Sequence, residues 1–424
     1  MERFKTYILA LFVVTSIVMS YVLAFEQPGF EQLQHNKDVE STWMGDTQTA
    51  NDVLEPRKMV LHADGQRVYM SYFKQSGYVD IWNKLAQVPL TNVMDGRYDA
   101  EAFQMLRTKS IGFECVFDAT IPISALSSHL HFPESFTDSG QAVDRIWVYV
   151  REGSNAVHAV FVNEVEKTEV VASVSMSARE LKDLVAGGTK DAGPTYSWST
   201  YNVYLPDAPL SVQQTTHAFS TASATQLETS LFIEPGSVRK LLDQGGREIY
   251  TDGQRGLKIE RASKWMVFTN PIAANVSAGD WATSLNIAIQ FVNLHGGWDG
   301  SNVLLQVPTA ANPTYGFRQF VNAFPVVPHN ALNRADISIL LRNDMVSTYE
   351  RSTADDDLSV VRSSVTVRLP DAAGIIANNR AALLAPGLID VYPVYEKTYL
   401  TDNTVAYTPK WAAETANGQI TLLK

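Results

Sequence analysis

Residues 145–162 read RIWVYVREGSNAVHAVFV and predict the kind of sheet from which this chain is built. Two runs rich in β-branched and aromatic residues, Arg145–Val150 and Val157–Val162, flank the turn sequence Glu152-Gly153-Ser154-Asn155. Such a pattern is typical of an antiparallel hairpin. Two more hairpins are expected on the same grounds: Lys58–His62 with Arg67–Met70 around Asp64-Gly65, and Glu248–Tyr250 with Leu257–Ile259 around Thr251-Asp252-Gly253.

Further strands and a few short helices are expected between these hairpins. Strands are predicted at Ser110–Ile121, Tyr201–Leu205, Trp265–Phe268, Val303–Val307, Phe317–Phe320, Ile337–Leu341 and Val365–Leu369. Helices are predicted over Tyr78–Leu85, from the capping box Ser177–Glu180 through Val185 to Gly187-Gly188, from Glu234 to Leu242, and over Trp281–Leu294. Because helices do not alternate regularly with strands, the sequence predicts an α+β fold with antiparallel sheets.

The N-terminus contains a stretch long enough to cross a membrane. Thr6–Phe25 is uncharged, and as a helix its 20 residues span about 30 Å, the thickness of the hydrocarbon core. Arg3 and Lys5 precede it, which predicts a cytoplasmic N-terminus, a single-pass anchor in the cell membrane and an extracytoplasmic bulk. A cleaved signal peptide ending at Ala24 is the alternative, although signal peptides have shorter apolar cores.

The predicted organisation has three domains outside the membrane. A cytoplasmic tail (1–5) and the transmembrane helix (6–25) are followed by a stalk (26–52). The Gly- and Pro-rich sequence at 186–198 then separates a first extracytoplasmic domain (53–195) from a central α+β domain (196–300) and a C-terminal α+β domain (301–424).

Composition and motifs narrow the function. The formal net charge of −11, without a basic cluster, argues against a nucleic-acid partner. The single cysteine, Cys115, lies in a strand pattern and is expected to be a buried thiol. No catalytic signature or phosphate-binding loop occurs, and we expect no cofactor, no metal and no enzymatic activity.

Three local patterns have a structural interpretation that we prefer to a functional one. His129 and His131 are interpreted as part of a polar loop before Pro133 rather than as metal ligands. Asp355–Asp357 is interpreted as a solvated loop rather than a cation site. His295-Gly296-Gly297-Trp298-Asp299 is expected to end a helix, with the glycines in left-handed backbone and Trp298 packed beneath them.

Several stretches resemble the YycH family of regulatory proteins of Gram-positive bacteria. They are Gln27–Glu31, Glu55–His62, Tyr204–Pro206, Leu231–Arg239, Tyr250–Leu257, Phe268–Pro271, Phe291–Trp298, Phe317–Asn322 and Pro409–Trp411. Their order along the chain carries the resemblance. The segment around Asp355 matches loosely, and the chain up to Thr200 matches only in patches.

The resemblance implies a single-pass membrane protein with a three-domain α+β outer portion and no catalytic residues. It also implies association with a YycI-like membrane protein and with a WalK-like sensor histidine kinase that controls cell-wall metabolism. A membrane-anchored binding module for a cell-wall or small-molecule ligand is the alternative and predicts a deep pocket. A wall hydrolase would need paired carboxylates or a metal site, and the sequence nominates neither.

The predicted membrane helix offers one candidate contact surface. Ser16, Ser20 and Ala24 recur every four residues and share one stripe of the helix. Small side chains allow a neighbouring membrane helix to approach closely, so this stripe is expected to bind a partner helix.

Overall fold

The structure of the chain is a computed structural model. It describes residues 45–63, 67–134, 136, 140–151, 153–190, 192–242, 247–271, 280–309, 313–329, 336–400 and 403–424. The described residues all belong to one compact unit. The predicted membrane helix lies outside the described residues, and no helix within them is both long and apolar enough to cross a membrane.

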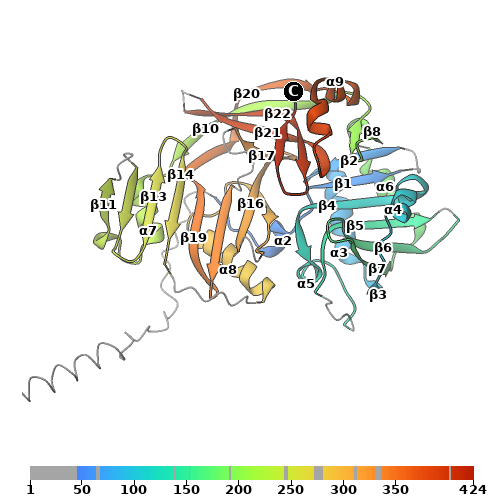
Figure 1. Cartoon of the computed structure of the whole chain (residues 1–424), viewed down its shortest axis with the longest axis horizontal. Helices are drawn as coiled ribbons and strands as arrows, with labels where there is room; N and C mark the ends of the chain where they lie inside the picture. Colours follow the sequence, from blue (N-terminus) through green and yellow to red (C-terminus); the bar gives the residue numbers. More distant parts are fainter. Residues whose placement is uncertain are drawn as a thin grey trace, which may run out of the picture. The chain divides into compact units, whose positions relative to one another are not determined.

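Nine strands of the described part form a first sheet in which every neighbouring pair is antiparallel, in the order β3-β7-β6-β5-β4-β1-β2-β8-β9. Their bounds are β1 Lys58–His62, β2 Val68–Tyr72, β3 Leu90–Asp95, β4 Ser110–Pro122, β5 Ala142–Arg151, β6 Val157–Asn163, β7 Thr168–Val174, β8 Thr195–Trp198 and β9 Tyr204–Pro206. The helices of this part are α2 Ala50–Val53, α3 Ser76–Gln87, α4 Ala100–Lys109, α5 Ile123–Leu126 and α6 Ala178–Gly188. Figure 1 shows the sheet from blue to green.

The hairpin of β5 and β6 shows why this sheet is covered on both faces. Its register runs from Arg145 opposite Val162 to Val150 opposite Val157, as the sequence predicts. Alternate side chains point to opposite faces of a strand. Trp147 and Val160 pack with Phe103 of α4 on one face, whereas the alternate residues join the large core cluster on the other. The sheet therefore has helices or strands against both of its faces.

A second sheet contains fourteen strands in the described part. Its main path is β11-β12-β13-β14-β19-β18-β16-β17-β21-β22-β10-β20, with β15 beside β16 and β23 beside β22. The strands are β10 Leu210–Thr221, β11 Arg239–Leu242, β12 Glu248–Thr251, β13 Gly256–Glu260, β14 Trp265–Thr269, β15 Ser301–Gln306, β16 Thr314–Val321, β17 Phe324–Pro328, β18 Ile337–Arg342, β19 Met345–Ser352, β20 Ala354–Leu369, β21 Leu388–Tyr399, β22 Thr404–Thr415 and β23 Ile420–Leu422. Its helices are α7 Ala224–Leu231, α8 Trp281–Leu294 and α9 Ala372–Leu383, with a 3-10 turn η1 at Pro235–Ser237. Among the described strand pairs, β17 with β21 is parallel and the rest are antiparallel.

The mixed α+β class with antiparallel sheets and short helices is confirmed, and so are several individual elements. Helix α6 begins at the predicted capping box, in which Ser177 Oγ accepts from the Glu180 backbone N–H and Glu180 in turn accepts from Ser177. Helix α8 covers the predicted Trp281–Leu294. Helix α3 extends the predicted Tyr78–Leu85 by about a turn in all, and its Tyr78, Ile81 and Leu85 are buried.

Two predicted elements differ in the structure. The helix expected from Glu234 to Leu242 is wrong: Pro235–Ser237 forms a single 3-10 turn, and Arg239–Leu242 is strand β11, paired with β12. Local helix propensity is weak and yields here to cross-strand contacts such as Lys240 Nζ to Glu248 Oε1 at 2.8 Å. The strand expected at Tyr201–Leu205 begins only at Tyr204, because Asn202 adopts left-handed backbone (φ 60°) in a turn.

Candidate functional site

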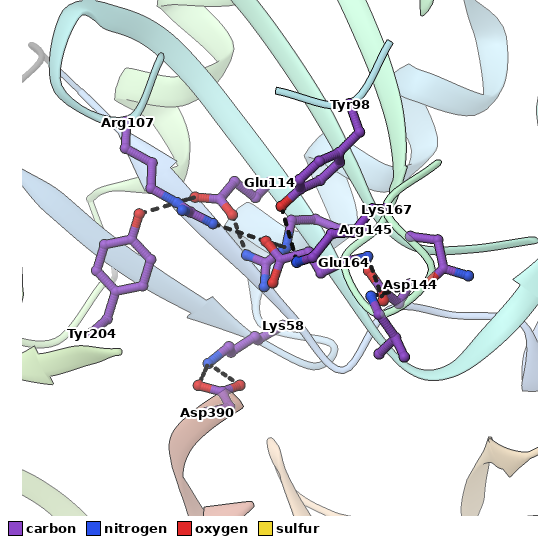
Figure 2. A network of polar contacts seen from close by, with 12 residues as sticks. Lys58, Tyr98, Arg107, Glu114, Asp144, Arg145, Glu164, Lys167, Tyr204 and Asp390 are labelled. Carbon is purple, nitrogen blue, oxygen red and sulfur yellow. Dashed lines mark hydrogen bonds and ion pairs between the residues drawn. The ribbon is translucent and has the colours of Figure 1, made fainter. Parts of the chain in front are cut away.

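The two sheets meet at a polar seam that contains a cleft of about 570 Å³. One wall comes from β1, β5, α4 and the turn between β6 and β7, and the other comes from the beginning of β21 with Ala416 after β22. Figure 2 shows charged side chains from both walls lying together. Their position follows from strand register: Lys58 lies opposite Val116, which lies opposite Arg145, so Lys58 and Arg145 face the same side of the first sheet as Glu114.

Glu114 is the centre of a buried charge network on the first sheet. Its side chain is completely buried, and one oxygen accepts from His62 Nε2 at 2.8 Å and from the Tyr204 hydroxyl at 3.0 Å. The other oxygen pairs with the Arg145 guanidinium. Burial acts to raise the pKa of Glu114, but Arg145 and His62 more than offset it and hold the pKa well below its usual range. Glu114 is therefore a fixed negative charge.

A second carboxylate, Glu164, extends this network to the mouth of the cleft. Its Oε1 lies 3.0 Å from Arg107 Nη2 and 3.4 Å from Arg145 Nε. Both guanidinium groups are thus shared between a buried carboxylate and a half-exposed one (Figure 2). Lys167, at the end of the same turn, is exposed and places its ammonium 3.4 Å from the Tyr98 hydroxyl.

Arg57 joins the two sheets at the seam. Its guanidinium binds Asp390 Oδ2 at 2.6 Å, Glu414 Oε2 at 2.9 Å and the Asp118 carboxylate, and it stacks 3.8 Å from the Tyr392 ring centre. Asp118 belongs to the first sheet, and the other three residues belong to β21 and β22. Burial acts to lower the pKa of Arg57, but these carboxylates raise it overall. Arg57 is therefore permanently charged and fully engaged by both sheets.

Lys58 reinforces the same junction from the neighbouring position. Its Nζ lies 2.7 Å from the carboxylate of Asp390. Burial lowers the pKa of Lys58, although Asp390 opposes that shift. Asp390 itself is buried, which acts to raise its pKa, but Lys58 and Arg57 lower it overall. The two basic residues thus hold Asp390 ionised at the junction of the sheets.

The charge of the side chains that line the seam changes from positive to negative along its length. The 570 Å³ cleft is lined by four basic and two acidic side chains: Lys58, Arg107, Arg145, Lys167, Glu164 and Asp390. A pocket of about 140 Å³ shares Arg145, Glu164 and Asp390 with it and adds Arg57 together with Asp118, Asp144 and Glu414. Burial raises the pKa of Asp144 to about 6 despite the opposing charge of Arg145. One stretch of the seam is therefore basic and the next is acidic.

The residues singled out by sequence lie elsewhere. His129 stacks on Trp82 with ring centroids 4.2 Å apart, and His131 is exposed in the loop before Pro133, in keeping with the structural interpretation. Within the described ranges no group of three or more potential ligands could hold a metal. Cys115 is buried in β4, as expected, and burial raises the pKa of its thiol above the usual range. Ser16, Ser20 and Ala24 lie outside the described residues.

The interpretation of Asp355–Asp357 as a solvated loop is wrong. The three residues lie in β20, and Asp356 is buried, where it pairs with Lys397 and accepts a hydrogen bond from the Tyr407 hydroxyl. Because side chains alternate between the two faces of a strand, Asp355 and Asp357 point to the face opposite that of Asp356. Asp355 is half-buried and Asp357 is exposed. This run of three aspartates can form part of a strand because Asp356 has a buried cation, Lys397, as its partner.

The expected helix end at His295–Asp299 is confirmed and has a further role. Gly296 and Gly297 have positive φ (125° and 69°), and Trp298 is buried. The turn also clamps the chain that precedes α2. Asn293 and Gln48 exchange hydrogen bonds of 3.0 and 2.9 Å, and the Trp298 backbone N–H donates to Asp46 O at 3.1 Å. This turn thus fixes the start of the described chain on the second sheet.

Sequence reasoning missed the seam as a site. Arg57, Lys58 and Glu114 appear in the sequence only as charged residues in or beside strongly apolar strand patterns. A charged residue inside an apolar strand pattern indicates that it has a partner of opposite charge in the core, since burying an unpaired charge is very costly. The partners Asp390 and Glu414 are more than 330 positions from Arg57. Periodicity alone cannot pair residues so distant in sequence.

Comparison with known proteins identifies the family. The model of the YycH protein N-terminal domain matches residues 2–187, and that of the YycH protein C-terminal domain matches residues 200–423. The chain belongs to the YycH family. The Arg57 cluster joins the two YycH domains, because Arg57 and Asp118 lie in the first match and Asp390 and Glu414 in the second.

Individual YycH proteins are distant in sequence and similar in fold. The two-component system WalR/WalK regulatory protein YycH of Bacillus subtilis (strain 168) is 19% identical over 447 aligned positions, which cover 99% of this chain and 95% of that protein. The crystal structure of YycH from Bacillus subtilis superposes with a TM-score of 0.70 at 17% identity, covering 90% of this chain and 98% of that one. At this identity the structural likeness supports the fold alone.

Proposed function

We propose that this chain is a membrane-anchored extracytoplasmic regulator of a WalK-like sensor histidine kinase. It acts by protein–protein contact, together with a YycI-like membrane protein, and through the kinase it controls cell-wall metabolism. The observation that carries the proposal is the match of both YycH domain models along the chain, with a curated relative named for regulation of WalR/WalK. The uncharged stretch Thr6–Phe25 supports the membrane anchor.

The most deeply buried charges of the seam have a structural role rather than a catalytic one. General acid–base catalysis needs a group that gains and loses a proton near the working pH. Glu114 is held ionised by its partners, and Arg57 is permanently protonated. Arg57 joins the two sheets, and Glu114 ties elements of the first sheet to one another, as structural ion pairs do.

A regulator outside the membrane must act through binding energy. It shifts the kinase between conformations only if it binds one of them more tightly than the other. The direction of the shift, towards or away from the active kinase, depends on which conformation is preferred. The seam is suited to such selective binding because its basic and acidic stretches have fixed positions. A partner can match them in one conformation and not in another.

The alternative function, a binding module for a cell-wall or small-molecule ligand, is favoured by one observation. The 570 Å³ cleft is of the size that small ligands occupy and contains convergent polar groups. Against it, Arg107 and Arg145 are engaged by Glu164 and Glu114 within the cleft. A small ligand would have to compete with these internal ion pairs.

Co-purification of the full chain from detergent-solubilised membranes tests the proposal. We expect a sensor histidine kinase and a YycI-like membrane protein to be recovered with it, in amounts that depend on expression of the chain. The control is a chain in which residues 1–25 are replaced by an unrelated membrane helix, which separates contacts of the outer part from those of the anchor. Recovery of a small ligand without any kinase would contradict the regulator and favour the binding module.

A further inference from the structure

The seam contains an exposed apolar pair as well as its two charged stretches. Val165, from the turn between β6 and β7, is 61% exposed, and Ile389 at the beginning of β21 is 43% exposed. Both line the basic cleft and the adjoining acidic pocket, so they lie where the two meet. They come from opposite sheets and belong to different YycH domains. Large apolar side chains left in solvent at one point of a concave surface are typical of a binding site.

The groove continues past the acidic pocket. A third hollow of about 680 Å³ shares Asp118 and Glu414 with that pocket and extends it along the second sheet. The side chain of Asp118 is 2% exposed, and among the described residues its Oδ2 has no hydrogen-bond partner, whereas Oδ1 is engaged by Arg57. A buried carboxylate oxygen without a partner in the wall of a groove favours an incoming donor, because an unsatisfied buried acceptor is costly.

The basic cleft contains a cation without an ion-pair partner among the described residues, Lys167. The ammonium of Lys167 is exposed and contacts the Tyr98 ring and hydroxyl, and within the described chain no carboxylate lies close enough to form an ion pair with it. Along the groove, a cation lies on the basic side of the apolar pair, and a buried acceptor lies on its other side, where the acidic pocket meets the third hollow. An elongated groove with this order suits an extended chain better than a compact ligand.

We infer that this groove binds an extended peptide segment of a partner protein, with an apolar centre, an acidic residue on the side of Lys167 and a basic residue on the side of Asp118. The inference rests on the proposed function only for the statement that the ligand is a protein. Apolar anchors at the centre of an interface supply most of the affinity, and flanking charges at its rim fix the register. Because each wall comes from a different sheet, a bound segment would also tie the two sheets together.

Peptide binding to the purified full chain tests the groove without any kinase. The probes are three fluorescein-labelled hexapeptides of one composition: Asp-Glu-Leu-Leu-Lys-Lys, the reversed order Lys-Lys-Leu-Leu-Glu-Asp, and the alternating Lys-Asp-Leu-Lys-Glu-Leu. Fluorescence anisotropy measures each Kd. We expect one of the two ordered peptides to bind at least about tenfold more tightly than the alternating one, because its charges are segregated as in the groove. Equal affinity for all three, or no binding, would overturn the inference.

Variants of exposed residues then locate the bound peptide. Ile389→Asp should weaken the preferred peptide about tenfold or more, and Lys167→Glu about fivefold. The matched controls are Val360→Asp, at an exposed valine of β20, and Lys182→Glu, at an exposed lysine of α6, and both should leave Kd unchanged. Wild-type affinity in both groove variants refutes the groove. If kinase recovery fails while the peptide result holds, the proposed function is refuted and the groove is not.

Discussion

At the residue scale, Arg57 is one of the contacts that join the two YycH domains. Its guanidinium engages Asp118 on one sheet and Asp390 and Glu414 on the other, with 4% of the side chain exposed. Removing one partner of a buried ion network leaves charges without compensation and costs about 3–5 kcal/mol. We expect Arg57→Met to lower the free energy of unfolding by about that amount, measured by urea denaturation of the purified chain.

A surface pair provides the control for Arg57. Arg179 and Asp183 lie 3.8 Å apart on α6, and their side chains are 92% and 75% exposed. Exposed pairs of this kind contribute little, so Arg179→Met should change the free energy of unfolding by less than about 0.5 kcal/mol. A similar small effect of Arg57→Met would contradict the role of Arg57 in joining the sheets.

The raised pKa of Asp144 predicts how the free energy of unfolding depends on pH. Burial raises its pKa to about 6 in the folded chain, against about 4 in an unfolded chain. The folded state therefore holds a proton that the unfolded state has lost between these values. The stabilising contribution is complete below about pH 4 and is lost as the pH rises through about 6.

The variant Asp144→Asn isolates this effect because its side chain stays neutral. The free energy of unfolding of the variant minus that of the wild type should be larger at pH 7 than at pH 4, by up to about 2–3 kcal/mol. Urea denaturation at the two pH values measures the difference. Equal values at both would show that the Asp144 carboxyl titrates normally.

At the scale of elements, the end of α8 depends on the conformation of one glycine. Gly297 has φ 69°, its N–H donates to Val292 O at 2.8 Å, and a Cβ there would lie 2.4 Å from Gly45 O. Gly418 has a similar φ of 77°, but a Cβ there would meet no atom within 4 Å. Gly418→Ala should therefore cost only the backbone strain, about 1–2 kcal/mol.

Gly297→Ala should cost clearly more than Gly418→Ala and should detach the chain that precedes α2. The added methyl cannot avoid the backbone of Gly45, because backbone atoms move less readily than the end of a side chain. Hydrogen exchange at residues 46–49 is expected to accelerate in Gly297→Ala and to stay unchanged in Gly418→Ala. Equal stability loss and equal protection in the two variants would argue against the clamp.

At the scale of the whole molecule, the predicted membrane helix tests whether the anchor contributes to recognition. Ser16→Leu with Ser20→Leu keeps the helix apolar, so insertion should persist. If the stripe that also includes Ala24 binds partner helices, a membrane two-hybrid signal with full-length partners should fall. Val14→Leu with Val18→Leu, on the bulky side of the helix, is the control. An unchanged signal in both would make the helix a tether and assign recognition to the outer part.

Much of the local structure could be predicted from the sequence. The hairpin of β5 and β6, the capping box of α6 and the glycine end of α8 depend on residues close together in the chain, whose periodicity and backbone preferences act locally. The α+β class follows from the same patterns. The order of motifs along the chain also indicated the family, which both YycH domain models confirm.

Tertiary structure decided what local preferences could not. Arg239–Leu242 became a strand because β12 offered partners, and Asp356 was buried because Lys397 forms an ion pair with it. The seam depends most of all on long-range contact, since the cost of burying Arg57 is met only when residues of β21 and β22 arrive beside it. The identity of a residue sets which partner it needs, and only the folded chain determines which partner it has.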